Sequence, residues 1–272
     1  MAEVTTGAGA PEVGQISWFH SIDLGNGVVT PGAPPNPALE QPGAFPDVQG
    51  RTVLDIGAWD GKYSFRAEQQ GATRVVALDH YVWQVDWAAR ERYWRQCEAE
   101  GRIPDPADQR FLSAKDVPGR RGFEYAKAAF GSRVEPVVAD FMTADLEALG
   151  TFDVVLFFGV LYHVLDPFAA LRRVRALTRE VAAIETAAIR VVGHRRAALI
   201  GFVAGDELGR DHTNWYVPTE AGLHQLCRAA GFGRVVTRVG PPPLLRHVRS
   251  RWRHHRLDGT TELYRAVVHA YP

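Results

Sequence analysis

The chain has 272 residues, of which 31 are basic and 31 acidic, so its formal net charge at pH 7 is zero with histidine neutral. This balance argues against a surface that attracts nucleic acid as a whole, although it leaves a local basic patch open. Hydrophobic residues make up 46% and charged residues 23%, as in an ordinary soluble globular domain. No apolar run reaches the roughly 20 residues that a membrane span needs.

The cysteines and the N-terminus narrow the class further. Cys97 and Cys227 give neither a disulfide framework nor a zinc-binding spacing. The opening MAEVTTGAGAPEVGQ has no basic start and no apolar core, so we interpret it as a disordered lead and not as a secretory signal. We expect a cytoplasmic protein without membrane contact, with a lead and N-terminal lid over 1–50 and the main domain over 51–272.

Short apolar runs alternate with helical patterns along the chain. Near-continuous apolar runs are typical of parallel strands buried on both faces, and five have this character: 52–57, 74–79, 133–140, 152–159 and 180–185. Pro136 lies in the third run and cannot donate to a ladder, so we predict an edge strand there. The alternation predicts a doubly wound α/β fold.

Two helices are well marked. In 166–180, apolar residues recur every third position, at Phe168, Leu171, Val174 and Leu177. In 218–232, Thr219 is a plausible N-cap, Gly231 fits the C-terminal stop, and Cys227 lies on the apolar stripe and is therefore predicted to be a core residue.

Three segments interrupt the alternation, at 16–50, 80–130 and 187–216. Ligands of open α/β sheets bind beyond the carboxyl ends of the strands, so segments that follow strands are natural lids and substrate pockets. Aromatic residues are frequent in these segments, and we assign to the lid and substrate pocket Trp18, His20, His212, Asn214, Trp215 and Tyr216.

The stretch VLDIGAWDGKYSF, residues 53–65, reads as a strand, a glycine turn and a helix. Gly57 and Gly61 fall short of the G-x-G-x-x-G pattern of dinucleotide enzymes. Asp55, two residues before the first glycine, would repel a pyrophosphate but suits a ligand with a positive amine, such as S-adenosylmethionine (SAM). Asp79 and Asp140 follow the next two strands, where carboxylates can accept hydrogen bonds from a ribose and an adenine amino group.

The segments VLDIGAWDG, ALDH and VVADF resemble the successive cofactor motifs of class I SAM-dependent methyltransferases. LFFGVLYHVLDP resembles the fourth-strand motif of one subfamily, which includes the bacterial transferases of the tRNA wobble uridine and many small-molecule methyltransferases of secondary metabolism. WFHSIDL and NWYVPT extend the likeness to roughly residues 16–240. The resemblance implies a Rossmann-like sheet of seven strands, with 234–239 and 263–270 as the last, antiparallel pair.

The resemblance also implies site residues. Asp55, Gly57 and Gly61 would hold the methionine moiety, Asp79 the ribose, and Asp140 with Phe141 the adenine. The full predicted cofactor set adds four neighbours of these motifs, Ala58, His80, Phe158 and Gly159.

One branch of these relatives transfers a carboxymethyl group, whose extra carboxylate needs cationic partners. That branch has a lysine before the first strand and an arginine after its LYH. Here residues 25–50 contain no lysine or arginine, and Val164 follows His163, which leaves Tyr162 as a weak anchor. We therefore expect methyl transfer from ordinary SAM.

Proton removal from an alcohol acceptor suits a histidine near neutral pH. His163, after the fourth strand and beside Tyr162, is the predicted base, with a helix-capping role as the alternative. His20 and His212 are second choices. Asp211 and His212 alone are a poor metal signature, so we predict no metal.

Two classes of acceptor remain. A hydroxyl of a sugar or natural product, as in antibiotic biosynthesis, fits the neutral charge and the aromatic segments. A tRNA acceptor is the alternative, supported by the resemblance and by the basic run RHVRSRWRHHR at 246–256, which also reads as a solvated loop. A homo-oligomer is a candidate assembly for either.

Overall fold

The structure is a computed structural model that describes residues 13–25, 27–113, 115–194, 196–242 and 261–272. Most of the lead predicted to be disordered, residues 1–12, lies outside the described residues, and so does the basic run at 246–256. Among the helices described, none is long and apolar enough to cross a membrane.

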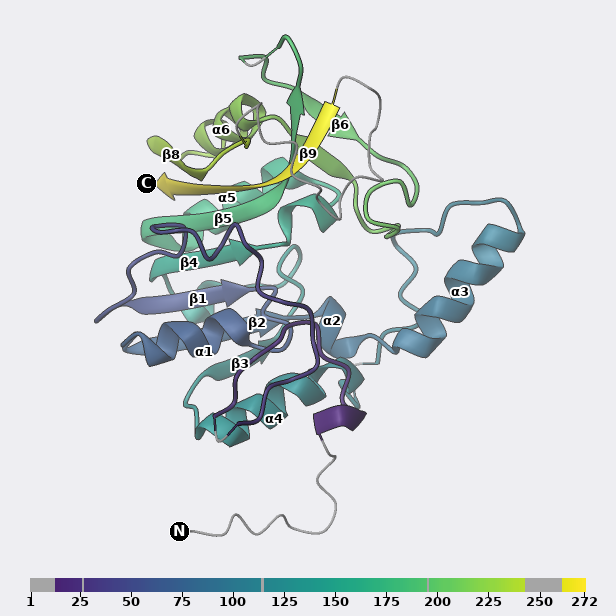
Figure 1. The fold of residues 1–272 in the computed structure, drawn as a ribbon, viewed down its shortest axis with the longest axis vertical. Helices are drawn as coiled ribbons and strands as arrows, with labels where there is room; N and C mark the ends of the chain where they lie inside the picture. Colours follow the sequence, from purple (N-terminus) through teal and green to yellow (C-terminus); the bar gives the residue numbers. More distant parts are fainter. Residues whose placement is uncertain (1–12, 26, 114, 195, 243–260) are drawn as a thin grey trace.

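A seven-stranded sheet with the order β3-β2-β1-β4-β5-β9-β8 forms the centre of the molecule (Figure 1). Its strands are β1 (Thr52–Ile56), β2 (Arg74–Asp79), β3 (Glu135–Val138), β4 (Phe152–Phe158), β5 (Thr178–Val191), β8 (Arg234–Val239) and β9 (Thr261–Tyr271). Strands β1 to β5 pair in parallel, and β9 runs antiparallel to both of its neighbours. This is the predicted Rossmann-like arrangement, and β3, which carries Pro136, is the predicted edge strand.

Strand β5 is much longer than the apolar run at 180–185. It pairs with β9 from Ala182↔Ala270 to Val191↔Thr261, so the expected segment at 187–216 begins as strand. A small two-stranded sheet, β6 (Ile200–Phe202) and β7 (Tyr216–Pro218), follows. The extension depends on a partner some 80 residues later in the chain, and a local pattern cannot show such a partner.

Helices cover both faces of the sheet, which is why its central strands β1, β2 and β4 are apolar almost throughout. The neighbours Val53 and Leu54 of β1 enter opposite core clusters. The first cluster includes residues of α1 (Lys62–Gln69) and α4 (Arg121–Phe130), and the second includes residues of α5 (Pro167–Leu177) and α6 (Glu220–Ala229).

Of the two marked helices, α6 has the predicted N-cap, and α5 has one residue of its predicted stripe out of place. Thr219 Oγ1 accepts a hydrogen bond from Gly222 N–H at 3.1 Å, and Cys227 is fully buried. Phe168, expected on the buried stripe of α5, is instead 40% exposed. Residues three apart drift by about 60° around a helix, so a stripe that buries Val174 and Leu177 carries Phe168 toward solvent.

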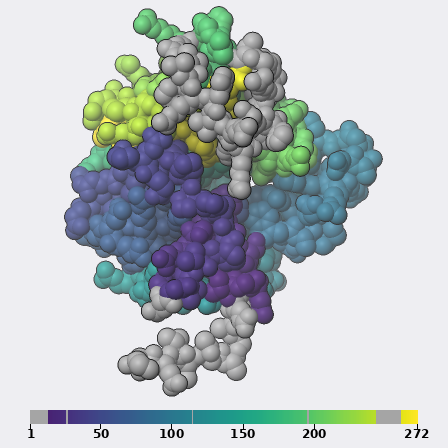
Figure 2. Space-filling model, in the orientation of Figure 1, coloured from purple at the N-terminus to yellow at the C-terminus, as the bar shows by residue number. Residues whose placement is uncertain are grey.

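The segment at 80–130 is not a single insertion. Its last helix, α4, buries Phe123 against the sheet, whereas α2 (Tyr81–Gln84) and α3 (Trp87–Ala99) lie beyond the carboxyl ends of the parallel strands, and α3 projects sideways (Figure 1). The N-terminal segment crosses the front of the molecule (Figure 2) and buries Leu39 and Val48 in the first core cluster.

Short 3₁₀ turns are η1 (Val13–Gln15), η2 (Pro118–Arg120), η3 (Glu147–Leu149) and η4 (Leu161–His163).

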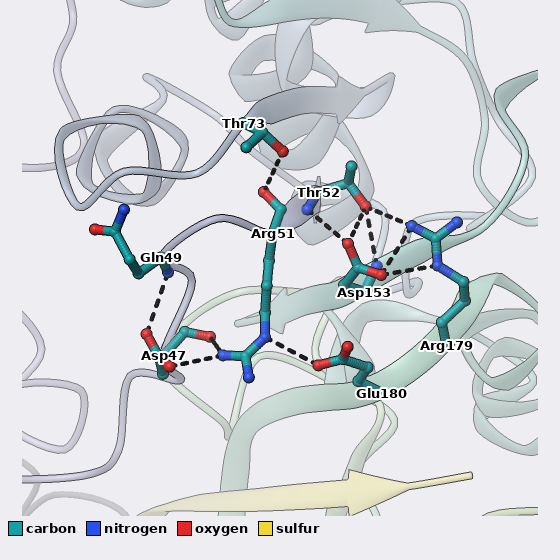
Figure 3. Close-up of polar contacts among 8 residues, drawn as sticks. All are labelled: Asp47, Gln49, Arg51, Thr52, Thr73, Asp153, Arg179 and Glu180. Carbon is teal, nitrogen blue, oxygen red and sulfur yellow. Dashed lines mark hydrogen bonds and ion pairs between the residues drawn. The ribbon is translucent and has the colours of Figure 1, made fainter.

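A polar network joins the amino ends of β1, β4 and β5, opposite the edge where ligands of this fold bind (Figure 3). Asp153 accepts hydrogen bonds from Thr52 N–H at 2.9 Å and from Arg179 Nε–H at 2.8 Å. Burial raises the pKa of Asp153, but these donors outweigh it, and the net shift is downward. The network therefore helps to fix the register of these three strands. It lies at the opposite edge of the sheet from the candidate ligand site.

Candidate active site

The glycine turn between β1 and α1 has no room for side chains. Gly57 and Gly61 have φ of 79° and 80°, in the left-handed region. A Cβ at Gly57 would lie 2.4 Å from Val160 Cγ2, and one at Gly61 would lie 2.5 Å from Phe65 Cε2. Gly57 N–H donates to the Leu78 carbonyl oxygen at 2.8 Å, which holds the turn beside the end of β2. The turn is therefore a tight backbone cradle, with Ala58 buried inside it.

Two carboxylates are buried beside this cradle. Asp55 is 2% exposed and accepts from Ser64 Oγ–H at 2.6 Å. Asp79 is 4% exposed and accepts from Trp59 N–H at 2.9 Å and Val82 N–H at 3.1 Å. Burial raises the pKa of each acid to about 6, and the charge of Asp79 adds to the effect on Asp55. A cationic ligand would favour the ionised acids. These two carboxylates therefore fit a ligand that carries an amine and a sulfonium, and they do not fit a pyrophosphate.

The predicted adenine residues lie next to Asp79. Ala139 N–H donates to the Asp79 carbonyl oxygen at 3.2 Å, which places the start of the following loop there. Asp140 already accepts hydrogen bonds within its own turn, from Met142 N–H at 2.9 Å and Thr143 Oγ–H at 2.7 Å. Phe141 is 6% exposed and packs on Phe157. His80 occupies the N-cap position of α2.

The N-terminal segment docks on the glycine turn through Asp60, which was not among the predicted site residues. Asp60 is 1% exposed and accepts hydrogen bonds from Phe19 N–H at 3.1 Å and from His20 N–H at 2.7 Å. Its other oxygen lies 2.5 Å from His20 Nδ1. His20 is thus brought to the glycine turn. The Trp18 ring packs edge-on against Tyr125 of α4.

A series of side chains in aromatic and cation–π contact borders the same edge. Phe19 and Trp59 stack with ring centroids 3.9 Å apart and planes inclined by 15°. The guanidinium of Arg90 lies 4.1 Å from the centroid of Trp94. The full series joins the N-terminal segment, the turn, α3 and the loop before β7, in the order Phe19, Trp59, Trp87, Arg90, Trp94 and His212.

The end of β4 carries the predicted catalytic pair. Gly159 N–H donates to the Glu185 carbonyl oxygen at 3.0 Å, and Phe158 is 8% exposed. His163 Nδ1 lies 2.8 Å from Thr213 Oγ1 and 3.1 Å from the Thr213 carbonyl oxygen. Burial lowers the pKa of His163, although the nearby Asp211 acts in the opposite direction. The His163 ring is therefore neutral near pH 7.

A buried ion pair beside Tyr162 was not predicted. Glu185 is 1% exposed and binds Arg265 through both carboxylate oxygens, one of them 2.6 Å from the terminal nitrogen. Asn36 of the N-terminal segment donates to the same carboxylate at 2.8 Å. The Arg265 guanidinium lies 4.9 Å from the centroid of the Tyr162 ring. Because Glu185 and Arg265 come from different strands, no local sequence signal marks the pair.

The remaining predicted lid residues are structural in their contacts. Asn214 and Trp215 are both 7% exposed. Trp215 N–H donates to the Tyr162 carbonyl oxygen at 2.7 Å, and Tyr216 Oη–H donates to the Leu165 carbonyl oxygen at 3.1 Å. These bonds fasten the start of β7 and the residue before it to η4 and the residues that follow η4. Within the described ranges, no group of three or more His, Cys, Asp or Glu side chains gathers as a metal site would require.

A sheet of this topology with a glycine cradle and buried acids at its first two strand ends defines a SAM-dependent methyltransferase fold. Residues 38–237 match the family model described as a methyltransferase domain, and the chain belongs to this family. Asp55, Asp79 and the turn at 57–61 are the residues that fit the cofactor SAM.

The chain is similar to curated tRNA U34 carboxymethyltransferases over part of their length. The tRNA U34 carboxymethyltransferase of Shewanella frigidimarina (strain NCIMB 400) is 27% identical over 176 residues, which cover 65% of this chain and 42% of the relative. That of Pseudomonas aeruginosa (strain LESB58) is 25% identical over 188 residues, covering 68% and 46%. The chain thus spans less than half the length of these relatives.

Among solved structures, the N-terminal domain of EvdMO1 with S-adenosylhomocysteine (SAH) bound superposes with a TM-score of 0.52. It is 18% identical, and the match covers 84% of this chain and 76% of that domain. A structure of the same domain in the presence of SAH and D-fucose gives a TM-score of 0.50. At this identity the similarity shows the fold.

Proposed function

We propose that the chain transfers a methyl group from SAM to a hydroxyl of a small molecule, such as a sugar or another natural product. The observation that carries this proposal is His163, whose neutral ring lies at the end of β4, next to the cofactor edge. A neutral imidazole can accept the proton of a hydroxyl, whereas an acceptor that is already nucleophilic needs no such base.

The residues divide the work between binding and proton transfer. Asp55, Asp79 and the glycine turn bind the cofactor and orient its methyl group toward the acceptor. When bound, SAM supplies an electrophilic methyl carbon, which the acceptor oxygen attacks while the carbon–sulfur bonding pair returns to sulfur. The hydroxyl proton passes to His163 Nε2. The aromatic series from Phe19 to His212 offers flat surfaces for the acceptor.

Carboxymethyl transfer to the wobble uridine of tRNA is the second candidate, and the names of the curated relatives favour it. A carboxylated cofactor needs a free cation near its extra carboxylate. Arg265 is the guanidinium closest to the Tyr162 ring among the described residues, and Glu185 already neutralises it through two contacts. This pairing, with the absence of lysine and arginine from residues 25–50, ranks the candidate second.

The test offers SAM or carboxylated SAM to the full chain, with deoxysugars, phenolic natural products or unmodified tRNA as acceptors. Mass spectrometry follows the acceptor and the SAH formed. We expect methylation of a small-molecule hydroxyl that depends on His163, with His163→Gln as the matched inactive variant. Carboxymethylated tRNA, or SAM-dependent methylation of tRNA only, would overturn the proposal.

A further inference from the structure

Three side chains form a hydrogen-bonded line behind the proposed base. His163 Nδ1 contacts both oxygens of Thr213, at 2.8 Å and 3.1 Å. The Thr213 hydroxyl lies 2.6 Å from Asp211 Oδ1, and the same carboxylate oxygen accepts the Thr213 backbone N–H at 2.9 Å. The Trp215 bond to the Tyr162 carbonyl oxygen holds the two segments together, although His163 and Thr213 are 50 residues apart.

The chemistry of these groups fixes the direction of each bond. An ionised carboxylate only accepts, so the single hydroxyl proton of Thr213 is donated to Asp211. Thr213 Oγ1 then has only lone pairs to offer to His163, and the Thr213 carbonyl oxygen can also only accept. Both contacts therefore require a proton on His163 Nδ1. In the neutral ring, the lone pair is then on Nε2, for which the described residues provide no hydrogen-bond partner.

We propose that Asp211 and Thr213 form a relay that holds His163 in the Nδ1–H tautomer, so that Nε2 is presented as the base. The inference rests on the proposed function of His163. Asp211 does not touch the ring and acts through Thr213, so both are positioning residues. When Nε2 accepts a proton, the positive charge is shared with Nδ1–H, and its bonds to Thr213 strengthen, backed by the Asp211 charge.

Charges from several elements act on this ring. Burial is the largest influence and disfavours the imidazolium, and Arg265 of β9 and Arg90 of α3 act in the same direction. The Tyr162 ring lies beside it, with centroids 4.3 Å apart. Asp211 opposes the two guanidinium groups. Removing the charge of Asp211 should therefore make His163 harder to protonate and leave its tautomer less defined.

The experiment is a pH titration of the ¹⁵N-histidine-labelled full chain by long-range ¹H–¹⁵N NMR, with and without SAH and without any acceptor. His163→Gln identifies the signals of this ring. We expect a protonated Nδ1 and an unprotonated Nε2 at neutral pH. In Asp211→Asn and Thr213→Val, the pKa of His163 should fall and Nε2–H signal should appear. Thr213→Ser should behave as the parent chain, and so should Asp206→Asn, which neutralises an exposed acid of the same loop.

Two results would overturn the relay: an Nε2–H tautomer in the parent chain, or an Asp211→Asn titration that matches that of Asp206→Asn. SAH binding to each variant reports whether it is folded. If Thr213→Val does not fold, Asp211→Asn and Thr213→Ser still decide the question. A chain that shows the relay but neither binds SAM nor methylates refutes only the proposed function, and a methylating chain with the Nε2–H tautomer refutes only the relay.

Discussion

Asp55 and Asp79 are acids whose ionised forms the protein interior disfavours, and their proposed role in binding SAM therefore predicts a pH dependence of that binding. Their pKa values rise from 3.8 to about 6 in the folded chain. Protonation of these two acids therefore stabilises the folded, unliganded chain relative to the unfolded chain. This contribution to the free energy of unfolding is lost as the pH rises through about 6. A cationic ligand reverses the preference, because it stabilises the ionised carboxylates.

We predict that SAM affinity increases between about pH 5 and pH 7.5, and that binding near pH 6 releases protons. Calorimetry in buffers of different ionisation enthalpy measures the release. Asp79→Asn should bind SAM more weakly at neutral pH, by roughly 1.5–3 kcal/mol for each hydrogen bond lost to a charged acceptor. It should also raise the stability of the unliganded chain at neutral pH. Binding that takes up protons, or does not respond to pH, contradicts this account.

A second prediction at the residue scale concerns His163. His163→Gln should lower kcat by about 10²–10⁴-fold while SAM affinity changes little. Because burial lowers the pKa of His163, the acid limb of the pH–rate curve should lie below the ordinary histidine value of 6.5. Activity should be lost as the pH falls through that pKa, because the protonated ring cannot act as a base. Normal turnover per folded molecule would show that the acceptor needs no base at this position.

Among the elements, the N-terminal segment joins the core to the site. It buries Ile22 and Leu24 in the first core cluster, and its hydrogen bonds to Asp60 fix it on the cofactor turn. Gly25 and Gly27 have positive φ, whereas Gly32 passes directly over the backbone of His20. The segment is therefore docked at several points, through Ile22, Leu24 and Gly32, and a lid function requires at least part of it to open.

Gly32→Ala tests this docking, because the added Cβ would lie 2.2 Å from the carbonyl carbon and oxygen of His20. We expect a lower melting temperature, faster proteolysis within residues 16–33 and weaker SAM binding. Gly14→Ala is the matched control, since its Cβ meets nothing within 4 Å. If the two variants have equal SAM affinity, the segment does not support the cofactor site.

For the molecule as a whole, SAM should raise the free energy of unfolding by mass action, by about 2.7 kcal/mol at a concentration near 100 times Kd. Thermal melting with SAM, SAH or NAD measures this effect. We expect stabilisation by SAM and SAH but none by NAD, because the buried acids repel a pyrophosphate. Stabilisation by NAD alone would contradict the assignment of the cofactor site.

The balanced charge of the whole chain gives a further prediction. With 31 basic and 31 acidic residues, the chain should not be retained by a heparin or tRNA column near physiological salt. Counterion release makes nucleic-acid binding strongly salt-dependent, so strong retention that added salt abolishes would instead favour the tRNA acceptor.

The sequence by itself determined the five parallel strands of the sheet, the edge position of β3 and the cradle at Gly57 and Gly61, whereas the antiparallel pair β8 and β9 was expected only from the family resemblance. The first three follow from local rules: the period of apolar residues, the missing N–H of proline, and the tolerance of glycine for positive φ. The buried acids Asp55 and Asp79 could also be predicted, because parallel strands end at one edge. The pattern failed at Phe168, where the drift of a three-residue spacing turned one apolar side chain outward.

Tertiary structure alone decided which polar groups meet around the site. Glu185 contacts Arg265, His20 contacts Asp60, and His163 contacts Thr213, over sequence separations of 80, 40 and 50 residues. Such pairs carry no periodicity, and each partner by itself resembles an ordinary surface residue. They meet because β9 returns antiparallel to β5 and because two long segments fold back over the carboxyl edge of the sheet. Burial at this edge makes an unpaired charge or polar group costly, so each such group is stabilised by its partner.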